Sequence, residues 1–215
     1  MGRGNSGVAR TPATTTVANN PVLASQLQSL LPAGTNVQTA AAGFRNAGQF
    51  IAAVHVSHNL GIPFDQLKAK MTGTPSESLG HAIRDLRPNL THSQVHAAVE
   101  TADRQRAADL AANRLMTEIS ASPRLARRVQ TLLPSGMTLQ DAATGFRNEK
   151  QFLAALHVSR NLGIPFAQLK AKLTGPNPES LGHAIQDLRP VLSHDAVEAD
   201  VETARDQAKR DLRRG

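Results

Sequence analysis

The sequence predicts an all-α protein of two tandem, pseudo-equivalent modules, each of about five helices, joined by a long helix. Residues 20–110 recur as residues 122–212 without a gap, every matched pair lying 102 positions apart. A period of about a hundred residues exceeds the roughly 20 to 50 of solenoid repeats and indicates two whole domains. All six Phe fall at matched positions, as core anchors would, and no alternating β-branched run signals a strand. The expected organisation is a flexible Gly/Thr/Pro tail over 1–19, module 1 over 20–110, a helical connector over 111–121, and module 2 over 122–215 with a basic C-terminal end.

The first helix of each module is predicted to start at a capping residue followed by proline, Asn20-Pro21 and Ser122-Pro123. Proline suits the first helical position because its backbone angle is fixed and it has no N–H to leave unpaired. A brief helical segment follows, begun by Asn36 in module 1 and by Thr138 in module 2.

The central helix of each module is predicted over 47–60 and 149–162, capped by Asn46 and Asn148. These stretches are apolar nearly all round, which is typical of a helix enclosed by others. Gly61 and Gly163 end them, since glycine adopts the left-handed conformation without steric cost. The next helix begins at Ile-Pro-Phe and is closed by another glycine.

The fifth helix of module 1 is predicted over 78–86. Residues 74–77, Thr-Pro-Ser-Glu, have the pattern of a capping box before it. In module 2 the matched helix is predicted to start at Asn177-Pro178. The last helix starts at Thr91 or Ser193. In module 1 no Gly or Pro interrupts it before about Ala121, so it is expected to continue as the connector.

The net charge of +7 invites a nucleic-acid interpretation, but its distribution weakens that interpretation. Residues 20–110 carry a net charge of +1 and residues 122–212 of +2, and the remainder lies in the ends and the connector. Without Cys, disulfides and thiolate zinc sites are excluded, and no apolar run approaches the roughly 20 residues of a membrane span.

Three histidine pairs recur at matched positions: His55 and His157, His81 and His183, His92 and His194. They suggest metal binding or proton transfer, yet no H-E-x-x-H arrangement places two ligands on one face. The chain also has no nucleophile elbow, phosphate loop or paired carboxylates. We therefore expect neither an enzyme nor a cofactor or metal site, and the recurring acids are expected to be a cap or solvated partners of Lys and Arg.

Each module contains a predicted helix, a turn at Asn-Leu-Gly-Ile and a second helix. This order resembles a helix-turn-helix. In that interpretation a DNA groove would face the polar residues of the second helix, namely Gln66, Lys68, Lys70, Gln168, Lys170 and Lys172. A plain αα-hairpin has the same pattern and is the favoured alternative. Arg45 and Arg147, in the shared phrase Gly-Phe-Arg-Asn, form the other candidate surface, because Arg there is free to bind a partner's carboxylate or to lie over Phe.

Three short motifs, Gly48-Gln49-Phe50, Asn59-Leu60-Gly61 and Ser78-Leu79-Gly80, precede an Ala-rich charged helix. Their order resembles a group of exported bacterial proteins of unknown function, which carry one module of the pattern GQFVAA, NLG, SIG behind a signal peptide. The resemblance covers most of each module and implies an extracellular or periplasmic location. This chain departs from the pattern in having two modules, Lys150 within the second GQF triplet, and no apolar stretch typical of a signal peptide in its first 19 residues.

Together these patterns predict a non-enzymatic interaction or structural protein whose duplicated faces engage a protein partner or further copies of itself. Two equal weak contacts on one chain raise avidity. The alternative is a DNA-binding protein that uses the two hairpins and the basic ends.

Overall fold

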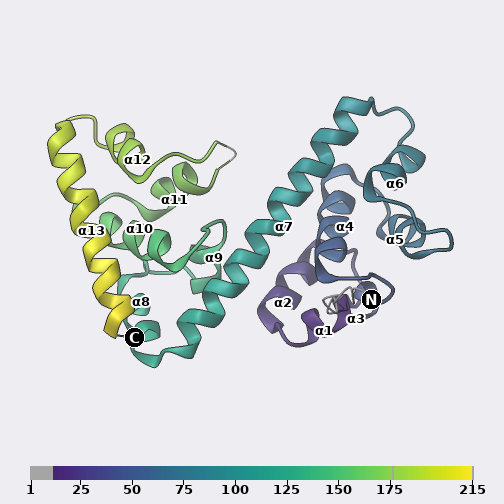
Figure 1. Cartoon of the computed structure of the whole chain (residues 1–215), viewed down its shortest axis with the longest axis horizontal. Helices are drawn as coiled ribbons and strands as arrows, with labels where there is room; N and C mark the ends of the chain where they lie inside the picture. Colours follow the sequence, from purple (N-terminus) through teal and green to yellow (C-terminus); the bar gives the residue numbers. More distant parts are fainter. Residues whose placement is uncertain (1–11, 176, 215) are drawn as a thin grey trace, which may run out of the picture. The chain divides into compact units, whose positions relative to one another are not determined.

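The computed structural model describes residues 12–175 and 177–214. These residues form helices and contain no strand, so the predicted all-α class is confirmed. In chain order the helices are α1 (Ala13–Ala18), α2 (Pro21–Leu30), α3 (Val37–Ala41), α4 (Ala47–Leu60), α5 (Phe64–Thr72), α6 (Leu79–Leu86), α7 (His92–Ala121), α8 (Pro123–Leu132), α9 (Leu139–Ala143), α10 (Glu149–Leu162), α11 (Phe166–Thr174), α12 (Leu181–Leu188) and α13 (His194–Arg214) (Figure 1). Among them, no helix has both the length and the apolar character needed to cross a membrane.

The chain divides into two compact units, unit 1 (Met1–Ala107) and unit 2 (Ala108–Gly215). In unit 1 the central helix is α4, which contacts α1, α2 and α5. Its side chains from Phe50 to Ser57 are all buried, because the helix is enclosed on every side as its apolar sequence predicts. Phe44 and Phe64 pack on Phe50, with ring centroids 5.5 Å and 6.2 Å from it.

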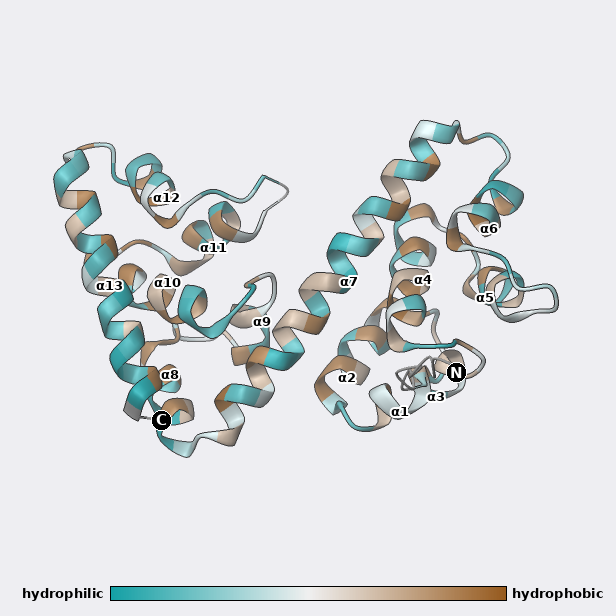
Figure 2. Ribbon diagram, viewed as in Figure 1, coloured by the Kyte–Doolittle hydropathy of each residue, from teal (hydrophilic) through white to brown (hydrophobic). Residues whose placement is uncertain are grey.

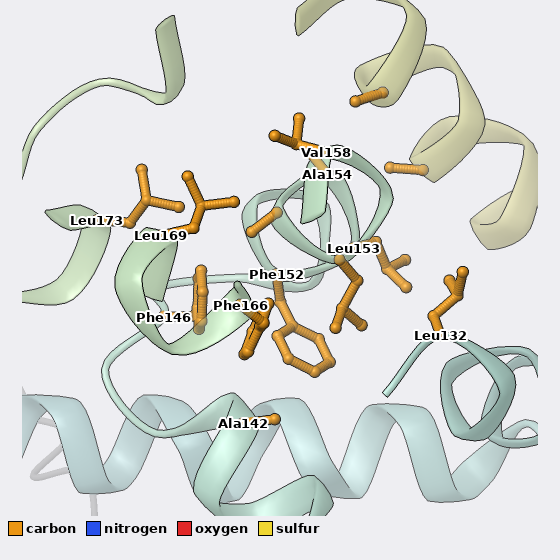
Figure 3. Packing of buried hydrophobic residues seen from close by; sticks show 14 of the residues in the cluster. Leu132, Ala142, Phe146, Phe152, Leu153, Ala154, Val158, Phe166, Leu169 and Leu173 are labelled. Carbon is orange, nitrogen blue, oxygen red and sulfur yellow. The ribbon is translucent and has the colours of Figure 1, made fainter. Parts of the chain in front are cut away.

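In unit 2 the central helix is α10, which packs against α13, α11 and α8. Its Phe152 lies in a triangle with Phe146 and Phe166, at centroid distances of 5.4 Å and 6.3 Å (Figure 3). Fully burying one such ring contributes on the order of 1.5 to 3 kcal/mol, so the three rings anchor this core. Figure 2 shows that α13 is largely hydrophilic, and only one stripe of it, with Val197, Ala204 and Ala208, enters the core.

The N-terminal segment departs from its prediction as a flexible tail. Residues 13–18 form α1, and Ala13 and Val17 are fully buried, because their spacing of four residues puts both on one helical face. The remainder of the expected tail, 1–11, lies outside the described residues. Ala13 and Val17 stand 102 positions before Leu115 and Ile119, which was the signal in the sequence that the repeat begins earlier.

The predicted continuous last helix of module 1 is confirmed as α7, which has 30 residues. The expected boundary between module 1 and the connector, at residue 110, differs from the boundary that the packing shows. The boundary between the units lies at Ala107, and Leu115 and Ile119 belong to the buried core of unit 2. Residues 111–121 are therefore part of unit 2 rather than a separate connector.

The helix ends mostly follow the sequence signals. Asn46 and Asn148 each accept a hydrogen bond from the backbone N–H three residues on, at 2.9 Å, and Gly61 and Gly163 adopt left-handed conformations with φ of 59°. Asn20 precedes α2 without accepting a side-chain capping bond.

The capping residues of α6 and α12 differ from the predicted ones. Their caps are Ser78 and Ser180, whose hydroxyls accept from the N–H of His81 and His183. The expected capping box at Thr74 is wrong because Glu77, instead of closing it, turns toward Lys70.

Candidate functional site

The histidine of α10 belongs to a polar cluster inside unit 2. His157 on α10 is 2% exposed, and its Nε2 lies 2.8 Å from Asp211 Oδ2 on α13. Arg128 Nε on α8 lies 3.3 Å from the same oxygen. Burial lowers the pKa of His157 below its ordinary value, although the hydrogen bond to Asp211 opposes the shift. These contacts link α8, α10 and α13.

The other matched histidines lie apart from one another. His55 is buried on α4, whereas His81 and His183 are exposed on α6 and α12. His92 and His194 are the exposed first residues of α7 and α13, and His194 Nε2 lies 3.4 Å from Glu198 Oε1 one turn on. Within the described residues, no three side chains of His, Asp or Glu are grouped to hold a metal ion.

The lysines expected to face DNA are bonded to their own units. Lys68 Nζ donates to the backbone oxygen of Thr39 at 2.7 Å, and Lys170 Nζ donates to that of Asp141. Each lysine thereby ties the second helix of its hairpin to the short helix before the central one. Burial lowers the pKa of Lys170, which is consistent with a group enclosed by its neighbours.

Lys70 and Lys172 are also engaged. Lys70 Nζ lies 3.1 Å from Glu77 Oε1 and also contacts Asp85 Oδ2, and Lys172 Nζ lies 3.0 Å from Glu179 Oε1 and contacts Asp187 Oδ2. These bonds raise the pKa of both lysines. The remaining oxygens of the two glutamates, Oε2, are buried without a hydrogen-bond partner among the described atoms. The sequence predicts these glutamates as capping residues, because spacing along the chain does not show that α5 and α11 bring Lys70 and Lys172 to them.

The other candidate contact residues remain on the surface. Gln66, Gln168, Arg45 and Arg147 are all exposed. Arg45 Nη2 donates to Ser76 Oγ at 2.8 Å, across the loop before α6.

Unit 2 contains a cavity of about 450 Å³ that sequence reasoning missed. It is bounded by the first turn of α10, the end of α11, the start of α12 and one side of α13, and its lining residues are Asn148, Lys150, Gln151, Ala154, Leu173, Glu179, Ser180, Leu181, Arg205 and Lys209. We call it the α10–α12–α13 cavity. Residues from three distant stretches meet here, so no local motif could have revealed it.

A wider groove of about 930 Å³ adjoins this cavity and lies between α12 and α13. We call it the α12/α13 groove. It shares Ser180, Arg205 and Lys209 with the cavity, and Gly182 and Val197 lie where the two helices approach each other. A Cβ on Gly182 would meet Val197 Cγ1 at 3.9 Å, which is ordinary van der Waals contact. Glycine at this position therefore leaves space that a side chain could occupy.

The comparisons with known proteins add no relative: no family model matches the chain, and neither does a curated protein or a solved structure.

Proposed function

We propose that this protein is a non-enzymatic, helical interaction protein made of two copies of one module. The observation that carries the proposal is the contrast between bonded polar groups and an open groove. The polar groups most suited to chemistry, the His157–Asp211 pair and the lysine–carboxylate clusters, link helices to one another. The α12/α13 groove, by contrast, is open and large enough to receive side chains of another protein.

The tandem organisation is supported by contacts that recur 102 positions apart. Ser57 Oγ donates to the carbonyl of Ile62 at 2.7 Å, and Ser159 Oγ donates to that of Ile164 at 2.7 Å. Arg87 donates to the carbonyl of Gly61 and Arg189 to that of Gly163. If each module contacts a repeated or symmetric partner, the two contacts on one chain raise avidity.

The partner is a protein or a second copy of this chain, and the groove offers it mixed chemistry. Val197 and Val201 line the groove but are only 3% and 7% exposed, so its apolar surface is small, while Glu198 and Glu202 contribute negative charge and Arg205 positive charge. Protein interfaces combine an apolar centre with a polar rim in this way. The resemblance to exported bacterial proteins supports the further proposal that this encounter takes place outside the cytoplasm.

DNA binding through the hairpins has less support, because the ammonium groups of Lys68 and Lys170 already donate to backbone oxygens. Basic groups that contact phosphates displace the counterions condensed on DNA, so affinity should fall steeply with salt if the hairpins bound DNA. A duplex titration at several salt concentrations distinguishes the two functions.

Filling the groove tests the proposal. Gly182→Leu places a side chain beside Val197 in the groove, and Gly80→Leu places one at the matched position of unit 1, beside Val99, where a Cβ would also have a neighbour at 3.9 Å. Thr203→Leu, at an exposed position of α13 that does not line the groove, is the control. Self-association is measured by sedimentation equilibrium, and partner binding by cross-linking from position 183 in the native extract.

We expect each glycine variant to weaken association, the double variant to abolish it, and Thr203→Leu to have no effect. A strictly monomeric protein that forms no cross-link from position 183 would overturn the proposal. Equal loss of binding in the Thr203→Leu control would also contradict it.

A further inference from the structure

Positive charge gathers around one wall of the α10–α12–α13 cavity. Lys150 comes from the first turn of α10, and Arg205 and Lys209 come from α13. Lys209 Nζ donates to Asp206 Oδ1 at 2.9 Å. Within the described part of the chain, neither Lys150 nor Arg205 has an ion pair or a side-chain hydrogen bond, so two cations line the cavity without an anionic partner.

Two helix N-termini open into the same cavity. Asn148 caps α10 and Ser180 caps α12, and both residues line the cavity. Each cap accepts the N–H three residues on, at 2.9 Å and 3.2 Å, which leaves the first N–H groups of each helix without a partner inside the helix. Such ends attract negative charge through these N–H groups and through the positive end of the helix dipole.

The floor of the cavity is apolar. Ala154 and Leu173 are each 3% exposed, and Leu181 is half-buried beside them. The one acidic side chain in the lining, Glu179, pairs through Oε1 with Lys172 at 3.0 Å, and Lys172 also contacts Asp187. A volume of about 450 Å³ accommodates a small organic molecule rather than a bare ion.

From these observations we propose that the α10–α12–α13 cavity binds a small organic anion, a phosphate or carboxylate group on an apolar body. The anionic group lies between Lys150, Arg205 and the two helix ends, and the apolar body lies against Ala154, Leu173 and Leu181. The site goes beyond the protein-binding function proposed above and does not depend on it.

Unit 1 lacks these features at the positions 102 residues earlier. Gly48, Asp103 and Ala107 stand where Lys150, Arg205 and Lys209 stand in unit 2. Arg106 Nε lies 3.1 Å from Asp103 Oδ1, and Arg106 Nη1 lies 3.1 Å from where a Cβ on Gly48 would be. A paired arginine thus covers the first turn of α4, so the anion site is confined to unit 2.

Isothermal titration calorimetry of the full chain tests the site, with hexyl phosphate as the probe. Inorganic phosphate and hexanol are titrated separately, so that the contributions of the charge and of the apolar body to the affinity can be distinguished. The variants are Lys150→Gln and Arg205→Gln, and Arg84→Gln, at an exposed position of α6 in unit 1, is the matched control. Circular dichroism verifies that each variant is folded.

We expect hexyl phosphate to bind at a single site and each cavity variant to lose about tenfold in affinity, while Arg84→Gln binds like the unsubstituted chain. Hexanol should not bind, and inorganic phosphate should bind more weakly than hexyl phosphate. No binding of hexyl phosphate, or binding that both cavity variants leave unchanged, would overturn the proposal. Equal affinity for inorganic phosphate would overturn the apolar part of it.

Discussion

Units 1 and 2 cover the first turn of their central helices differently. In unit 1 Arg106, paired with Asp103, lies over Gly48, whereas in unit 2 Lys150 and Arg205 leave a cavity lined by positive charge. The interiors differ far less, since the three Phe of each unit lie within 6.3 Å of one another. The difference indicates that packing constrains the cores of both units, while the surface over α4 and α10 has been free to diverge.

The largest expected effect would test whether the two cores are energetically separate. Phe152→Ala should destabilise unit 2 by about 3 to 5 kcal/mol, because it leaves a cavity in a close-packed centre. Phe50→Ala should do the same to unit 1. Urea unfolding followed by circular dichroism should then show each variant shifting a different transition.

If both variants shift one common transition, the two units unfold as one, and each core depends on the other.

A smaller effect is expected at the glycines before the central helices. Gly145 has a φ of +94°, and a Cβ there would lie 2.7 Å from Thr174 Cβ, whereas at Gly43, with a φ of +91°, the nearest atom of Thr72 would lie 3.2 Å away. The left-handed conformation alone costs an L-residue roughly 1 to 2 kcal/mol. Gly145→Ala should therefore lower the melting temperature more than Gly43→Ala does.

Gly136→Ala isolates the backbone cost, because its φ is +81° and nothing lies within 4 Å of a Cβ there. A Gly145→Ala variant no less stable than Gly136→Ala would mean that Thr174 moves aside without cost.

The lysines of the hairpins should affect stability more than binding. Lys170→Met removes the bond to the Asp141 carbonyl and should destabilise unit 2 by about 0.5 to 1.5 kcal/mol, and Lys68→Met should have a similar effect in unit 1. Chemical denaturation measures both. Unchanged stability together with lost affinity for duplex DNA would instead favour the hairpin as a DNA reader.

The smallest effect concerns pH. Because burial lowers the pKa of His157 in the folded state from its ordinary 6.5, the unfolded chain binds the proton more readily. The stability that this group contributes is fully present above about pH 6.5 and is lost as the pH falls from there toward the lowered pKa. Denaturation midpoints of unit 2 measured across this range should decline, and His157→Gln should remove that part of the decline. A midpoint that rises on acidification would show that the hydrogen bond to Asp211 outweighs burial.

Much of the fold could be predicted from the sequence because the signals are local. The Asn46 and Asn148 caps, the enclosed helices that follow them and the glycines that end them all depend on residues within one or two turns. α1 was missed because six residues rich in Thr are too few to show a helical period. The cap of α6 was missed because it is Ser78 rather than Thr74, and Glu77 pairs with Lys70 on α5.

The site was harder to predict, since its parts are distant along the chain. Lys150, Ser180 and Arg205 meet only after α10, α12 and α13 have packed. The sequence did reveal which residues differ between the two copies, and Lys150 in place of Gly48 was noticed as a departure from a motif. It gave no indication that Arg205 would lie near the same helix end.

The phenylalanine triangles have a practical consequence for optical work on this protein. With neither Trp nor Tyr anywhere in the chain, the native molecule is nearly silent in near-ultraviolet absorption and emission. A single Trp introduced in place of Phe152 would fluoresce from within the core of unit 2, with almost no background emission from the rest of the chain. The emission wavelength and the quenching of this Trp would report on the packing of unit 2 alone.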